Sequence, residues 1–262
     1  MHEFLPSYSE YEKILKNLIN SGKYCDYSEA PRKDKFIVLR HDIEFSIDRA
    51  YYMSLLETKY GLVSSYFVQI TNNSYNAFSQ KNIKMLQEMI RNGHHVGLHY
   101  HCNGCLDSKK IKKGIKNEIP VLESMLGNDI KIDRFSMHRP AKQSRYWEIK
   151  IPNIINTYAE DYFVFDENAN ITSNLGVKYI SDSKHRWNYG FPDEKTLREN
   201  DKIQILIHPF SWTEKGLSNE NNFKSLINEK TLELMDTFSN EFQRYEECRE
   251  NIHSEYIKLK YK

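Results

Sequence analysis

The sequence predicts an α/β protein built on a mostly parallel, buried β-sheet. Short, mostly apolar runs, such as FIVL at 36–39 and IQILI at 203–207, have the length of strands but show no regular alternation with polar residues. Such runs are typical of strands that are buried on both faces. Segments with apolar residues at helical spacing lie between them, and strands that alternate with helices favour a parallel sheet surrounded by helices.

The helical pattern recurs several times along the chain. Helices are expected at 9–20, 46–61, 79–93 and 108–127, the last despite Pro120, and one or two amphipathic helices at 221–260. Glycine follows or closes the first three, as is common at the end of a helix. The amphipathic pattern at 221–260 predicts helices that pack on the rest of the protein or form a dimer contact.

Strand signals fill the gaps between these helices. Strands are expected at 36–42, 62–70, 94–99, 132–138 and 202–210, with weaker helix or strand signals at 163–169 and 177–183. No shift in composition marks a linker, and no internal repeat or low-complexity segment occurs. A single domain spanning 1–262 is therefore the simplest interpretation.

Composition and charge exclude several classes of protein. The 262 residues carry a formal net charge of +1, which gives no indication of a nucleic-acid-binding face. The chain lacks the apolar run of about 18 residues that a membrane span needs. Its start lacks the basic and apolar regions of a secretory signal, so we expect a cytoplasmic protein with reduced cysteines.

Polar side chains that ionise, donate hydrogen bonds or bind metals follow the apolar runs. They are Arg40, His41, Asp42 and Glu44 after the first strand, His99, His101 and Cys102 after the third, His138 and Arg139 after the fourth, Asp182 and Ser183 near 177–183, and His208 after the last. The carboxyl ends of parallel strands meet at one edge of a sheet, where ligands bind. These side chains are therefore expected to form one site.

The residue types at this edge favour metal-assisted hydrolysis. Two imidazoles and one carboxylate are a typical ligand set for a catalytic Zn²⁺ ion. A second carboxylate can act as general base, and a further histidine can protonate the leaving group. Asp42 and Glu44 share one face of a regular strand, so one could bind the metal and the other accept a proton. His41 points to the opposite face and is expected to pack there.

These segments resemble the motifs of the polysaccharide deacetylase family, the NodB-type carbohydrate esterases. The matching segments occur in the order that the family has: LRHDIE (39–44), GLVSSYFV (61–68), GHHVGLHYH (93–101), FSMHRP (135–140), YISDSKHRW (179–187) and ILIHP (205–209). The resemblance covers about 36–212 and leaves 213–262 as a C-terminal helical extension. It implies a distorted (β/α)7-type barrel.

The resemblance also implies a role for most of the candidate residues. Asp42 corresponds to the general base and Glu44 to a metal ligand, although swapped roles remain an alternative. His99 corresponds to the first metal histidine, Arg139 to the residue that orients the base, and His208 to the general acid. His138, Asp182, Trp187 and Trp212 are expected to contact the substrate.

The sequence departs from the family pattern at the second metal histidine, whose usual position is occupied by Asn103. We assign this ligand to His101, with Cys102 or Asn103 itself as alternatives. The expected cofactor is a divalent metal, Zn²⁺ in the first place, with Co²⁺, Ni²⁺ or Mn²⁺ as alternatives. The residues of these motifs are similar to those of a WbmS-like branch of the family, which is found in lipopolysaccharide and O-antigen gene clusters.

Two functions of different class follow from these observations. The first is a metal-dependent deacylase that removes an N-acetyl or N-formyl group from an amino-sugar precursor of a cell-surface polysaccharide. The alternative is a non-catalytic or repurposed barrel that binds a nucleotide- or lipid-linked sugar, or a hydrolase of another C–N amide bond. Either way the expected partner is a small-molecule or lipid-linked sugar. The oligomeric state is left open.

Overall fold

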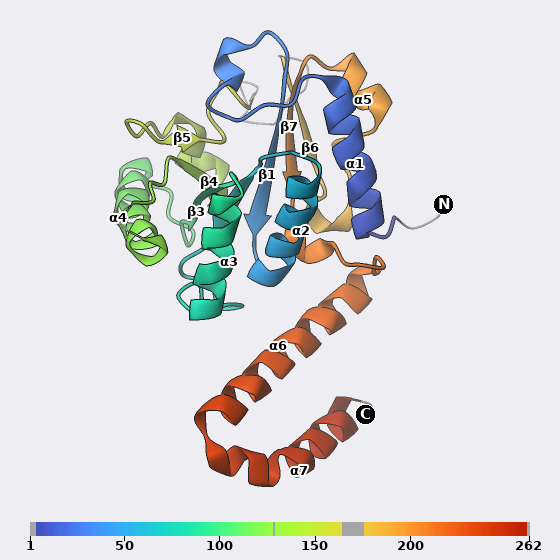
Figure 1. The fold of residues 1–262 in the computed structure, drawn as a ribbon. Coiled ribbons are helices and arrows are strands. Elements are labelled where there is room, and N and C mark those ends of the chain that lie inside the picture. Colours follow the sequence, from blue (N-terminus) through green and yellow to red (C-terminus); the bar gives the residue numbers. More distant parts are fainter. Residues whose placement is uncertain (1–3, 128, 164–175, 261–262) are drawn as a thin grey trace. The chain divides into compact units, whose positions relative to one another are not determined.

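One sheet of seven parallel strands forms the centre of the fold (Figure 1). The computed structural model describes residues 4–127, 129–163 and 176–260. The strands lie in the order β5-β4-β3-β2-β1-β7-β6. Their bounds are Phe36–Ile43 (β1), Ser65–Val68 (β2), His95–His101 (β3), Arg134–His138 (β4), Ile155–Asn156 (β5), Val177–Ser181 (β6) and Lys202–Ile207 (β7). The predicted α/β class is confirmed.

The sheet is curled into a distorted barrel. Arg40 of β1 reaches across the interior to donate to Thr157, directly after β5, and also contacts Gln204 of β7. Phe163 and Tyr179 bring the two ends of the sheet together, with ring centroids 4.8 Å apart. The edge strands β5 and β6 do not pair with each other in the described part of the chain, so the barrel is open there.

Helices cover the outside of the curled sheet, as Figure 1 shows for α1 to α5. Their bounds are Tyr8–Ser21 (α1), Ile47–Lys59 (α2), Gln80–Arg91 (α3), Ser108–Leu126 (α4) and Glu194–Glu199 (α5). Neighbours in this layer pack in the order α4-α3-α2-α1-α5, which follows the order of the strands beneath them. Ser7, Ser46, Ser79 and Asp107 begin the four long helices by accepting backbone N–H bonds, as N-cap residues do.

The alternation of side chains along β1 determines what faces the site. Ile37, Leu39 and His41 point to the helical layer, whereas Arg40 and Asp42 point into the barrel. A strand places successive side chains on opposite faces. The apolar residues at the start of β1 therefore pack both against the helices and inside the barrel, whereas the polar side chains near its end face the barrel interior. This pleat brings Asp42 and, one residue past the strand, Glu44 to the same edge.

Some elements differ from the sequence prediction. β5 has two residues and α5 has six, and neither was predicted, because segments this short show no periodicity. The predicted strand at 62–70 is shorter than expected, with pairing confined to Ser65–Val68. The weak signal at 163–169 falls, from residue 164 onward, outside the described residues.

The C-terminal residues form a separate unit, Asn219–Lys262, and the first unit is Met1–Ser218. Its described part consists of α6 (Asn219–Glu241) and α7 (Gln243–Lys260), so the expectation of one or two helices is met by two. Among the helices of the described residues, none combines the length and the apolar character needed to cross a membrane.

Gly97 of β3 lies where the barrel interior has no room for a side chain. A Cβ atom at this position would lie 2.7 Å from the ring of Phe67 and 2.8 Å from the side chain of Arg134. We expect Gly97→Ala to lower the free energy of unfolding by about 1–3 kcal/mol, the usual cost of overpacking a core. Urea unfolding of the two proteins measures this difference, and equal midpoints would show that the interior relaxes freely.

Candidate metal centre

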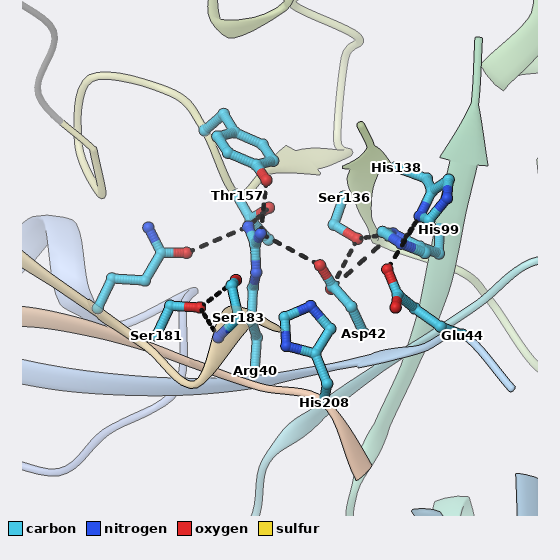
Figure 2. Close-up of polar contacts among 12 residues, drawn as sticks. Arg40, Asp42, Glu44, His99, Ser136, His138, Thr157, Ser181, Ser183 and His208 are labelled. Atoms are coloured by element: carbon cyan, nitrogen blue, oxygen red, sulfur yellow. Dashed lines mark hydrogen bonds and ion pairs between the residues drawn. The ribbon is translucent and has the colours of Figure 1, made fainter. Parts of the chain in front are cut away.

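Five strands deliver side chains to the same edge of the barrel. Figure 2 shows Asp42, Glu44, His99, His138 and His208 grouped above the ends of β1, β3, β4 and β7. Asp182, at the end of β6, joins this group through a hydrogen bond to His208. The prediction that the polar strand ends form one site is therefore met by these residues.

Three of these side chains converge as candidate metal ligands. One ligand atom each from Glu44, His99 and His138 lies within 4.8 Å of the other two. His99 Nε2 is 3.1 Å from His138 Nδ1, and His138 Nδ1 is 3.2 Å from Glu44 Oε1. Two imidazole nitrogens and one carboxylate oxygen match the donor set of a catalytic Zn²⁺ site, so the residues present fit a divalent metal ion.

Burial and neighbouring charges set the protonation of these candidate ligands. Burial lowers the pKa of His99 to about 4, so its imidazole is neutral and can bind a metal. Burial alone would raise the pKa of Glu44, but its hydrogen bond to His138 and the charge of His208 lower it below the ordinary value. A neutral imidazole and an ionised carboxylate are the forms that ligate metals.

Asp42 lies next to the candidate ligand His99, inside the barrel, and is almost completely buried. Its Oδ1 accepts a hydrogen bond from Ser136 at 3.0 Å and is 3.9 Å from His99 Nδ1, and its Oδ2 is 3.2 Å from Arg40 Nη2. Burial would raise the pKa of Asp42, but the charges of Arg40 and His208 and the hydrogen bond from Ser136 outweigh it and lower the pKa. Asp42 is thus a carboxylate held in a fixed orientation.

Arg40 is a fully buried cation, which the sequence placed among the polar strand-end residues without giving it a role. Its guanidinium donates to Thr157 Oγ1 at 2.6 Å and to the Tyr158 hydroxyl at 2.7 Å, and it lies 4.4 Å from the centre of the Tyr158 ring. These partners are neutral, so Asp42 is the anion with which Arg40 is ion-paired. A charge buried this deeply requires such a partner.

Arg139 occupies a different place from the one its motif implied. It is exposed and has a left-handed backbone conformation, with φ of 43°. The guanidinium that contacts Asp42 comes instead from Arg40, two residues away on the same strand. The orienting role assigned to Arg139 is therefore corrected in favour of Arg40.

His208 is paired with Asp182 on the neighbouring strand. His208 Nδ1 is 2.7 Å from Asp182 Oδ1, and the backbone N–H of His208 donates to the same carboxylate. Burial would lower the pKa of His208, but the charge and hydrogen bond of Asp182 raise it to about 9. His208 therefore holds a proton at neutral pH, as a general acid must.

The sequence assigned Asp182 and Trp212 to the substrate, but the structure gives them a positioning role. Trp212 is fully buried, and its indole N–H donates to Asp182 Oδ2 at 2.9 Å. It cannot touch a substrate without rearrangement. Trp187 is partly buried and packs edge-on against Phe4 and Phe191, in the apolar cluster that also contains Trp212. Trp212 thus supports His208 through Asp182, and Trp187 packs in the same apolar cluster.

His101 stands beside the donor cluster but outside it. Its ring centre is 4.8 Å from that of His138, edge to face. The grouped donors in the described residues are Glu44, His99 and His138. The second histidine ligand that the sequence assigned to His101 is therefore reassigned to His138, which the sequence assigned to the substrate.

His41 lies on the opposite face of β1, as the strand pattern predicted. It is fully buried, and its Nε2 is 2.7 Å from Glu57 Oε1. Glu57 also accepts hydrogen bonds from Tyr11 and from Tyr66, and its Oε2 is 3.5 Å from His94 Nδ1. This network ties β1 to α1 and α2 and takes no part in the site.

A pocket of about 460 Å³ lies in the loop that follows β2. Its lining is polar but uncharged, apart from one apolar residue: Ile70, Asn72, Asn73, Ser74, Tyr75 and Asn76. The loop is tied to the metal-site strand, because Asn72 donates to the backbone oxygen of Glu44 at 2.7 Å and Tyr75 donates to that of Ile43 at 3.0 Å.

No family model and no curated protein matches the chain. One similar solved structure is that of the Streptococcus pyogenes deacetylase PplD in complex with acetate. It is 16% identical in sequence, the match covers 48% of this chain and 60% of that chain, and the TM-score is 0.38. A CE4 family pseudoenzyme from Bacillus anthracis is 11% identical over 78% of this chain and 62% of that chain, with a TM-score of 0.41.

A Streptococcus mutans CE4 esterase is 12% identical, with 84% of this chain and 89% of that chain covered and a TM-score of 0.46. The chain spans less than two thirds of the length of the Streptococcus pyogenes and Bacillus anthracis proteins. The comparisons thus give a distant likeness to CE4 deacetylases and to a CE4 pseudoenzyme. At these identities and TM-scores they add nothing to the assignment of the site.

Proposed function

We propose that the protein is a metal-dependent deacylase that hydrolyses the N-acyl group of an amino sugar. The observation that carries the proposal is the convergence of Glu44, His99 and His138, with a buried carboxylate on one side and a protonated histidine nearby. Metal-assisted amide hydrolysis needs ligands for a metal ion, a general base and a general acid in one site.

The chain's own residues divide the reaction between them. Glu44, His99 and His138 would hold the divalent ion, which when bound polarises the acyl carbonyl and acidifies water. Asp42, ionised and fixed by Arg40 and Ser136, accepts the proton of the attacking water.

His208 completes the reaction at the leaving group. Its hydrogen bond to Asp182 fixes the ring through Nδ1, which leaves Nε2 to give a proton to the departing amine. The products are a carboxylic acid and a free amino group. Proton transfer is therefore shared between an acidic residue on β1 and a histidine at the end of β7.

The pocket beside Glu44 supports a neutral sugar as the bound portion of the substrate. Amide, hydroxyl and phenol groups hydrogen-bond to sugar hydroxyls, whereas a phosphate is usually met by Arg, Lys or a helix N-terminus. The resemblance to WbmS-like proteins supports an intracellular precursor of a cell-surface polysaccharide, such as O-antigen, as the source of this sugar. Zn²⁺ is the metal we propose.

Metal content and acetate release together test this function. Protein treated with a chelator and then reloaded with Zn²⁺ or Co²⁺ is expected to bind about one ion per chain. The loaded protein, but not the stripped protein, should release acetate from at least one of a panel of free and nucleotide-linked N-acetyl amino sugars. A wild-type protein that binds none of Zn²⁺, Co²⁺, Ni²⁺ and Mn²⁺ would contradict the proposal.

Asp182 is expected to control the protonation of His208. In Asp182→Asn the nearest attractive charge is lost, so the pKa of His208 should fall well below about 9, because burial is then opposed only by the charges of Glu44 and Asp42. Activity that needs protonated His208 persists up to the pKa and is lost above it, so the alkaline limb of the pH–rate profile should move to lower pH.

NMR titration of His208 in metal-free protein measures this pKa directly, and the pH dependence of kcat/KM measures its effect. The raised pKa also predicts a contribution to stability that is complete below about pH 6.5 and lost as the pH rises towards 9. An unchanged pKa in Asp182→Asn would show that the carboxylate does not control His208.

A further inference from the structure

We propose that Ser136 is a positioning residue that fixes His99 in the tautomer whose Nε2 can bind a metal ion. The inference rests on the metal site of the proposed function and concerns a residue that none of the motifs includes in a catalytic role. Ser136 is fully buried on β4, directly opposite His99 in the register of β3 and β4. Figure 2 shows its hydroxyl between His99 and Asp42.

The hydroxyl of Ser136 has two partners and one proton. Its oxygen is 3.0 Å from Asp42 Oδ1 and 2.6 Å from His99 Nδ1. Asp42 is ion-paired with Arg40 and is therefore a carboxylate, which only accepts hydrogen bonds. Two oxygens at 3.0 Å with no proton between them would repel each other, so Ser136 must donate to Asp42.

This assignment determines the proton on His99. Once the Ser136 proton points to Asp42, the Ser136 oxygen can only accept from His99, so Nδ1 must carry the hydrogen. A neutral imidazole carries one such hydrogen, and Nε2 is left with a free lone pair. Nε2 is the nitrogen that faces His138, on the side of the candidate ligands.

The neighbouring hydrogen bonds agree with this tautomer. His99 Nε2 lies 3.1 Å from His138 Nδ1, and that nitrogen also lies 3.2 Å from Glu44 Oε1. In metal-free protein, His99 Nε2 and Glu44 both act as acceptors, and one hydrogen on His138 Nδ1 satisfies the whole group. This hydrogen would have to move to His138 Nε2 for Nδ1 to bind an ion. The opposite tautomer of His99 would direct its N–H at the position that a metal must occupy.

Ser136 thus links the base and a metal ligand through one hydrogen-bond chain. Side chains that hydrogen-bond to the other ring nitrogen of a ligand histidine orient the ring and select its tautomer, and their loss usually costs about 10- to 100-fold in metal affinity. In Ser136→Ala the Nδ1–H of His99 loses its acceptor at 2.6 Å, and Asp42 Oδ1 lies at 3.9 Å, beyond hydrogen-bond distance, so the tautomer that cannot ligate becomes accessible.

The tautomer can be measured in metal-free protein by ¹⁵N NMR of histidine-labelled samples at pH 8. The signals of His99 are identified by their absence in His99→Gln. The expected result is a hydrogen on Nδ1 in the wild type and an altered Nδ1/Nε2 pattern in Ser136→Ala. A hydrogen on Nε2 in the wild type, or an unchanged pattern in Ser136→Ala, would overturn the inference.

Titration with Co²⁺ supplies the second readout. Ser136→Ala should bind Co²⁺ about 10- to 100-fold more weakly than the wild type. Ser181→Ala is the matched control, because Ser181 is also a fully buried serine near a strand end, and its hydroxyl contacts Ser183. Affinity equal to the wild type in Ser136→Ala would refute the proposal.

The two proposals fail in different ways. If the wild type binds no metal ion, the proposed function fails, while the tautomer measurement still decides the role of Ser136. If the wild type binds Co²⁺ and Ser136→Ala binds it equally well, the deacylase proposal stands and the role of Ser136 does not.

Discussion

Replacing Asp42 by asparagine is expected to reduce turnover by about 10²- to 10⁴-fold, the usual contribution of a general base. Asparagine has the shape of aspartate but cannot accept a proton from water. Glu44, His99 and His138 are unchanged in this variant, so the affinity for Zn²⁺ or Co²⁺ should fall far less than turnover. Steady-state kinetics and metal titration on the same preparation separate the two effects.

The same substitution is expected to lower stability, because Asp42 is the anionic partner of Arg40. Removing one member of a buried ion pair costs about 3–5 kcal/mol. Arg40→Met together with Asp42→Asn removes both charges and should recover part of this loss without recovering turnover. Full activity in Asp42→Asn, or recovery of activity in the double variant, would exclude Asp42 as the base.

His138→Gln is expected to weaken binding of Zn²⁺ or Co²⁺ by more than about 100-fold, which exceeds the usual effect of losing a side chain that only hydrogen-bonds to a ligand. The reason is that His138 Nδ1 lies in the cluster with Glu44 and His99. His101→Gln, on the adjacent strand end, should leave the affinity close to that of the wild type. Titration monitored by the Co²⁺ absorption spectrum measures both variants under the same conditions.

This pair of variants distinguishes between two assignments of the second histidine ligand, one from the structure and one from the motifs. The resemblance to the deacetylase motifs assigned the second histidine ligand to His101, whereas the structure groups His138 with His99. Strong loss in His101→Gln and none in His138→Gln would restore the motif assignment. The circular dichroism spectra of the two variants should match that of the wild type, because both residues lie at strand ends.

The fold could be predicted from the sequence because its main elements carry strong local patterns. The apolar runs at β1 and β7 and the glycine-terminated helices α2 and α3 are such elements. β5 escaped prediction because two residues show no pattern, and its place in the sheet depends on pairing with β4. Local pattern thus predicts long elements, whereas tertiary pairing determines the shortest one.

The sequence was sufficient to predict most of the residues that form the candidate site, but not which of their side chains lie next to one another. Asp42, Glu44, His99 and His208 could be found because each follows an apolar strand. His101 and His138 are partners in the register of β3 and β4, so both stand at the same level of the barrel edge. Which of them turns towards His99 depends on side-chain orientation, and no sequence pattern encodes this.

Two further errors have physical causes in the chain's backbone and packing. Arg139 leaves β4 in a left-handed conformation, so its side chain does not continue into the barrel, while Arg40 lies on the inward face of β1. Trp212 follows the short 3-10 turn Pro209–Ser211, which carries it away from the rim and into the core. Proximity in sequence to His208 was therefore a poor guide to contact with substrate.

The most direct test of the metal centre is an anomalous-scattering map from crystals grown with Zn²⁺ or Co²⁺. The structure predicts one strong peak among Glu44 Oε1, His99 Nε2 and His138 Nδ1, with Asp42 behind it. No peak at this position in crystals that contain the ion elsewhere, or a peak coordinated by His101 and Cys102 instead, would contradict the account.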